Sequence, residues 1–120
     1  MDAVTYSDSR TVEFVKDHMI PLRVSVSQDR LMAMRFQIQY TPTIVTLDGE
    51  GKELHREAGF YPSEELIPML MLGIGKGYVK DNRYDKALTI LSKLVERFPA
   101  SQSAPSAHSL KEICLRRLPR

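Results

Sequence analysis

The amino-acid sequence predicts an α/β layer followed by a helical tail, and three patterns lead to this fold class. Apolar residues recur at helical spacing near the N-terminus and then alternate with polar residues after Pro21. Two β-rich runs surround a glycine-containing turn at residues 48–51. From Ser63 onward the helical spacing dominates. Because the two spacings distinguish helices from strands, the expected order is helix, strand, helix, two strands and three helices.

The first two elements follow from capping and alternation. Ser7 or Asp8 can cap the first helix, and Pro21 ends it because proline cannot continue a helix. Leu22 to Ser27 reads as a strand with one buried face, since β-branched residues alternate with polar ones.

A second helix and a hairpin complete the α/β layer. Good helix formers predict the helix over residues 28–39, with apolar residues such as Leu31 facing inward. The run TIVTL at 43–47 predicts a strand, and the Asp-Gly-Glu-Gly turn at 48–51 returns the chain into a strand over 52–57.

Three helices form the expected tail. Ser63 caps a long apolar helix whose glycines at 73, 75 and 77 require a packing reason, because glycine weakens a helix. Residues 84–98 form a strongly amphipathic helix stopped by proline. Residues 100–109 are rich in Ser, Ala and Pro and predict a loop before a short last helix.

Composition excludes several function classes. The chain of 120 residues carries 17 Lys and Arg against 15 Asp and Glu, and the weak excess lies near the C-terminus, so we expect no nucleic-acid partner. No apolar window is long enough to cross a bilayer and no secretory signal is visible, so as written the chain is expected to be cytoplasmic and free of membrane contact.

Metal and cofactor chemistry is not expected. His18, His55 and His108 are far apart and lack the spacing of a metal site, so each is interpreted as a surface or rim residue. No carboxylate pair or Ser-His-Asp set stands out as catalytic. We therefore predict no metal, no cofactor and no catalytic residue.

The segment from Met32 to Thr43, MAMRFQIQYTPT, precedes a strand, a Gly turn, a second strand and Gly59. This order resembles the second half of a thioredoxin-like domain, with the resemblance covering residues 1–72. It implies a mixed sheet flanked by helices and a cis bond between Thr41 and Pro42. It also implies that Tyr40, Thr41 and Pro42 are substrate-binding residues in a peptide groove.

The sequence departs from that family in its cysteines. Relatives carry a strand and a Cys-x-x-Cys motif before the position of Met1, whereas Cys114 is the single cysteine here and cannot form an internal disulfide. Cys114 has helical spacing with Leu110 and Leu118, which favours a buried small hydrophobe. We expect an incomplete thioredoxin-like fold, either truncated or completed by another polypeptide, with sheet edges left open.

Residues 68–101 resemble one tetratricopeptide repeat. Gly75, Tyr78, Ala87 and Pro99 stand where that repeat has its Gly, Tyr, Ala and Pro. The resemblance implies a C-terminal helical hairpin, with small residues bringing its helices together, and residues 102–120 then serve as a capping helix and basic tail. A single repeat cannot bury its own face, so the hairpin must pack on the α/β layer. A plain helical tail that covers the sheet is the alternative.

Two functions follow from these resemblances. The first is a thioredoxin-like protein related to thiol-disulfide oxidoreductases that is redox-inactive in this form. The second is a non-catalytic adaptor that holds a protein or peptide by its sheet edge and its helical hairpin. The open edge could also serve self-association.

Overall fold

The computed structural model describes residues 8–20, 22, 25, 28–38, 42–59 and 61–118. Its helices and strands follow the expected order, apart from the strand expected at Leu22 to Ser27, which lies outside the described residues except for Leu22 and Ser25. The elements are α1 Ser9–His18, α2 Arg30–Arg35, β1 Thr43–Leu47, β2 Glu53–Ala58, α3 Ser63–Lys80, α4 Tyr84–Arg97 and α5 Ala104–Arg117.

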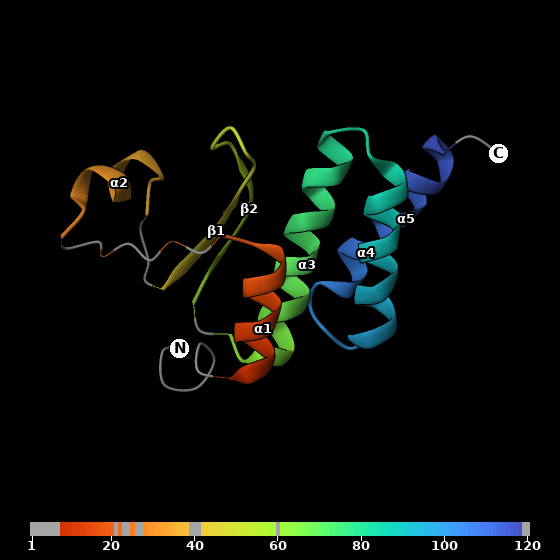
Figure 1. Ribbon diagram of the computed structural model, residues 1–120, viewed down its shortest axis with the longest axis horizontal. Coiled ribbons are helices and arrows are strands. Elements are labelled where there is room, and N and C mark those ends of the chain that lie inside the picture. The colour runs from red at the N-terminus through yellow and green to blue at the C-terminus, as the bar shows by residue number, and fades with distance from the viewer. Residues whose placement is uncertain are drawn as a thin grey trace.

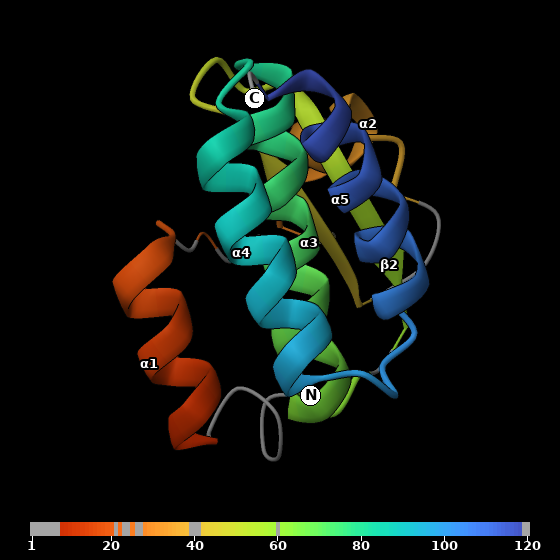
Figure 2. The same ribbon diagram turned by 90° about the vertical axis from the view of Figure 1, so that its right-hand side faces the viewer.

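The two strands form a layer with helices on both sides (Figure 1). One side of the hairpin faces α2, and the other side faces α3, which α1 accompanies. Beyond α3 follow α4 and α5, which lie side by side in Figure 2 and both contact α3. No helix of the described part of the chain, the long α3 included, is long and apolar enough to cross a membrane.

Helix α1 begins where the capping pattern predicted. The Asp8 side chain accepts a hydrogen bond from the backbone N–H of Arg10 at 2.8 Å, which satisfies a free amide of the first turn. Arg10 also pairs with Glu64 at the start of α3 at 3.1 Å. The apolar residues Phe14, Val15 and Met19 pack against buried residues of α3. Helix α1 is therefore fixed to α3.

Helix α2 is shorter than the 28–39 expected from helix propensity. Gln37 has a φ of 53°, and the N–H of Ile38 donates to the carbonyl of Ala33 at 2.9 Å. A left-handed residue followed by an N–H that bonds to the carbonyl five residues earlier is a Schellman motif. This motif ends the helix. The expectation that Leu31 faces inward is also wrong, because Leu31 is 82% exposed.

The hairpin forms with the predicted turn. β1 and β2 are antiparallel, with Thr46 opposite His55 and a bulge before Leu47 that leaves Leu54 without a partner. The Asp48 carboxylate accepts from the backbone N–H groups of Glu50 and Lys52, each at 2.9 Å, and so closes the turn.

The glycines of α3 have a packing reason on two opposite faces. A Cβ added at Gly73 would lie 3.0 Å from Thr46 of β1, and one at Gly77 would lie 3.1 Å from Leu54 of β2. A Cβ at Gly75 would lie only 2.7 Å from Leu91 of α4. The expected close approach of the two helices is therefore present, and α3 packs both on the sheet and on α4. The cap position of α3 is Pro62 and not Ser63.

Helices α3, α4 and α5 share the larger core, which includes Met71, Ala87, Leu91, Leu94, Ala107 and Cys114. The loop expected at residues 100–109 is wrong in its second half, because α5 already begins at Ala104. Pro105 stands in the first turn of that helix, where the missing N–H costs no intrahelical hydrogen bond. Small residues therefore pack α5 closely rather than form a loop.

Candidate functional site

The expected groove residues are only partly described. Tyr40 and Thr41 lie outside the described residues, so their role and the cis bond before Pro42 stay predictions. Pro42 is exposed and directly precedes β1. Its carbonyl accepts a hydrogen bond from the N–H of Gly59 at 2.7 Å, which extends the hairpin ladder by one step.

Cys114 lies in the core between the C-terminal helices. Its side chain is fully buried among residues of α3, α4 and α5. This confirms the prediction that Cys114 is a buried small hydrophobic residue. Burial raises the pKa of the Cys114 thiol. A thiol that is buried and protonated is a poor nucleophile, because the thiolate is the attacking species. Disulfide exchange at this residue therefore requires opening of the helical core.

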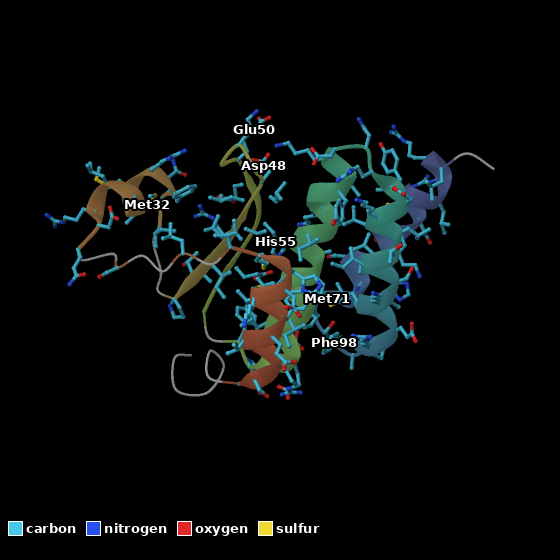
Figure 3. All side chains as sticks on the ribbon, viewed as in Figure 1. Met32, Asp48, Glu50, His55, Met71 and Phe98 are labelled. Carbon is cyan, nitrogen blue, oxygen red and sulfur yellow. The ribbon has the colours of Figure 1, made fainter. Side chains whose placement is uncertain are left out.

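A small polar pocket lies where β2 meets the beginnings of α3 and α5. Its volume is about 140 Å³. The lining residues come from segments distant in sequence: His55, Glu57, Tyr61, Glu65, Met69, Leu72, Gln102, Ser103 and Ser106. His55 occupies the space between the hairpin and α3 (Figure 3). Among the described residues no group of three or more His, Cys, Asp or Glu side chains could hold a metal ion.

Both ring nitrogens of His55 have a hydrogen-bond partner, which fixes its protonation. Its Nδ1 lies 2.8 Å from Nζ of Lys76, and its Nε2 lies 3.2 Å from Oε1 of Glu57. Burial and the positive charge of Lys76 lower the pKa of His55. The ring is therefore neutral near pH 7, and because the ammonium of Lys76 must donate to Nδ1, the proton stays on Nε2 and points to Glu57.

The interpretation of His55 as a surface or rim residue needs correction, whereas the same interpretation of His18 and His108 is correct. Only 12% of the His55 side chain is exposed, since β2 directs it toward the face that α3 covers. His18 and His108 are exposed on α1 and α5.

Glu57 receives hydrogen bonds on both of its oxygens. His55 donates to Oε1, and the hydroxyl of Tyr61 donates to Oε2 at 3.0 Å. Burial and this hydrogen bond to Glu57 raise the pKa of Tyr61, so its hydroxyl remains a donor. Lys76, His55, Glu57 and Tyr61 therefore form one continuous chain of hydrogen bonds from α3 across β2.

Glu65 supplies the second carboxylate of the pocket and joins two helices. Its Oε2 accepts a hydrogen bond from the backbone N–H of Gln102 at 3.0 Å, two residues before the start of α5. Ser103, which occupies the cap position of α5, is buried beside it. This contact aligns the beginnings of α3 and α5 around the pocket.

Sequence reasoning missed this pocket because its residues come from four segments. One signal was available: the strand sequence ELHREA places His55 and Glu57 two residues apart, hence on the same face. A strand face that carries two titratable residues and is covered by a helix is uncommon enough to indicate a site. The partners Lys76, Glu65 and Ser103 could be added only by the folded chain.

Comparison with protein families identifies a known domain in the chain. Residues 2–74 match the thioredoxin-like domain family, which is more than half of the chain. No curated protein and no solved structure matches the chain. The chain therefore belongs to the thioredoxin-like domain family.

Proposed function

We propose that this chain is a thioredoxin-like protein that is redox-inactive in this form and binds a protein or peptide. The burial of Cys114 carries the redox part of the proposal. Exchange between a dithiol and a disulfide requires an attacking thiolate and a second sulfur to resolve the mixed disulfide. This chain contains one cysteine, and its thiol is buried with a raised pKa.

The binding part of the proposal rests on the segment before β1. Tyr40, Thr41 and Pro42 directly precede a strand, and in the family resemblance these positions form the wall of a peptide groove. An extended partner segment at that wall would hydrogen-bond through its backbone, as in strand addition. The same edge of the hairpin could accept a second copy of the chain, which is the self-association variant of this proposal.

A second candidate function, an adaptor that binds through its helices, is favoured by the packing of α3 on α4. A Cβ added at Gly75 would lie 2.7 Å from Leu91, and Ala87 is buried in the same core. In the resemblance to a tetratricopeptide repeat, Gly75 and Ala87 stand where the repeat has its Gly and Ala. Helix α5 packs against α4 in the place of a following helix. Helix α3 also packs on the two strands, which supply the second surface that a single repeat needs. In this proposal residues 1–72 are the thioredoxin-like domain, residues 68–101 are the helical hairpin, and residues 102–120 are a capping helix with a basic tail.

Two measurements test redox inactivity. In an insulin-reduction assay with dithiothreitol, the purified chain should give the same rate as buffer. A thiol reagent such as 5,5′-dithiobis(2-nitrobenzoate) should label Cys114 in denaturant and leave it unlabelled under native conditions, since the side chain is fully buried.

Leu115 provides a matched control for the labelling. It neighbours Cys114 on α5 but is 56% exposed. The variant Leu115→Cys should gain one thiol that reacts rapidly without denaturant. Acceleration of insulin reduction by the wild-type chain, or labelling of Cys114 as fast as that of the new surface thiol, would contradict the proposal.

A further inference from the structure

We propose that the pocket lined by His55, Glu57, Tyr61 and Glu65 binds the guanidinium group of an arginine side chain presented by a partner polypeptide. The proposal rests on the protein-binding role above only for the polypeptide source of the arginine. The charges, the hydrogen bonds and the apolar wall of the pocket independently favour a guanidinium group.

The charge of the pocket favours a cation. Two carboxylates, Glu57 and Glu65, line it, whereas the neighbouring ammonium of Lys76 is bonded to the far ring nitrogen of His55. Within the described part of the chain, no Lys or Arg forms an ion pair with either carboxylate. With His55 neutral, two negative charges stand against one positive charge. A bound cation would restore the balance.

The hydrogen bonds already present leave acceptors open. Each carboxylate oxygen can accept about two hydrogen bonds. The recorded bonds to Glu57 come from His55 and Tyr61, and Glu65 accepts one from Gln102. These bonds fix both carboxylates in place without using up their lone pairs. The pocket is thus pre-organised for a ligand that donates several hydrogen bonds at once.

The shape and the wall favour arginine over lysine. Met69 and Leu72 supply apolar surface on which the aliphatic part of a long side chain can lie. A guanidinium is planar, carries five N–H donors and is less strongly hydrated than an ammonium, so it suits a partly enclosed pocket with two separate carboxylates. The hydroxyls of Ser103 and Ser106 add further acceptors at the α5 end.

The experiment is an NMR titration of the full chain with N-acetyl-arginine amide and, in parallel, with the neutral isostere N-acetyl-citrulline amide. The probes are the imidazole of His55 and the backbone amide of Gln102, which report both ends of the pocket. Saturable shifts of both probes with the arginine compound and none with the citrulline compound are expected. Equal shifts with both compounds would overturn the proposal.

Variants separate the pocket from general surface charge. Glu65→Gln keeps an acceptor for the N–H of Gln102 but removes the charge, and it should weaken binding about tenfold. Glu112→Gln on α5 makes the same charge change at an exposed position and should leave the affinity unchanged. An equal loss in the two variants would show that net charge, and not the pocket, attracts the ligand.

A peptide arm tests the source of the arginine. A short peptide with one central arginine should bind at least as tightly as the amino-acid amide, and its citrulline counterpart should not bind. Binding of the amide without binding of the peptide would overturn the polypeptide source of the arginine, whereas the proposed binding at the segment before β1 does not involve this pocket. Failure of both ligands would overturn the pocket and leave redox inactivity, which rests on Cys114, untouched.

Discussion

The two faces of the β1–β2 hairpin are covered in different ways. On one face, glycines bring α3 close to the strands, and Leu66 and Leu91 are nearly or completely buried beyond them. On the other face, Arg56 donates to the carbonyls of Phe36 and Gln37 at the end of α2. Leu31 of that helix remains 82% exposed. The α3 face is thus stabilised by apolar burial and the α2 face by polar contacts.

The two kinds of contact stabilise the chain by different amounts. Burial of one large aliphatic side chain contributes about 1.5–3 kcal/mol. Hydrogen bonds from a partly exposed arginine contribute about 1–2 kcal/mol in total, because water competes for the same groups. We therefore expect α3, α4 and α5 to unfold together as the most stable unit and α2 to open at lower free energy.

Truncation of a buried leucine should have the largest effect. Leu91→Ala removes a side chain with no exposed surface from the core between α3 and α4. The free energy of unfolding should fall by about 3 kcal/mol, since a cavity replaces packed methyl groups. Leu31→Ala on α2 is the matched control and should change it by less than about 0.5 kcal/mol. Chemical denaturation measures both, and equal losses would contradict the contrast between the two faces.

A second prediction concerns the helix contact at Gly75. Gly75→Ala should lower the free energy of unfolding by about 1 kcal/mol, because the clash with the fully buried Leu91 outweighs the gain in helix propensity. The double variant with Leu91→Ala should lose less than the sum of the single variants, because the shorter side chain relieves the clash.

Gly49 is the control for this cycle, because a Cβ added there would meet nothing within 4 Å. Gly49→Ala should leave the free energy of unfolding nearly unchanged. Strict additivity of Gly75→Ala and Leu91→Ala would show that the two positions are not in close contact.

A third prediction tests the polar attachment of α2. Arg56→Met removes the donors to the carbonyls of Phe36 and Gln37. Protection of the Ile38 amide against hydrogen exchange should fall about fivefold, whereas α4 amides should keep theirs. Arg97→Met, an exposed change on α4, should leave both unchanged. A loss of protection that spreads equally to α4 would mean that α2 belongs to the stable unit.

The smallest expected effect is a pH dependence from His55. Its pKa is lowered in the folded chain, so below about pH 6.5 the unfolded chain binds more protons. The stability that the neutral His55 contributes is therefore present above this pH and is lost as the pH falls. Denaturation midpoints at about pH 7.5 and about pH 5.5 measure the loss. His55→Gln should reduce this loss of stability, and His108→Gln should not. An equal loss in the wild-type chain and in both variants would contradict the placement of His55.

The local elements of this fold could be predicted because their signals are local. Asp8 caps α1, the Asp48 side chain closes the hairpin turn, and α4 ends at Arg97, one residue before the end of the expected range 84–98. The end of α2 could not be predicted, because Gln37 adopts a left-handed conformation that its residue type does not demand. The start of α5 was hidden by a Ser, Ala and Pro composition that fits a loop equally well.

The order of helices and strands and the burial of Cys114 could be predicted from the sequence alone, since helical and strand periodicity report which face of each element is apolar. The sequence also indicated that the glycines at 73, 75 and 77 need close neighbours. Only the tertiary structure decided which neighbours these are, and only it brought His55 together with Lys76 and Glu65. The reason is physical: a pocket depends on contacts between segments far apart in the chain, and their distances are set by packing rather than by spacing along the sequence.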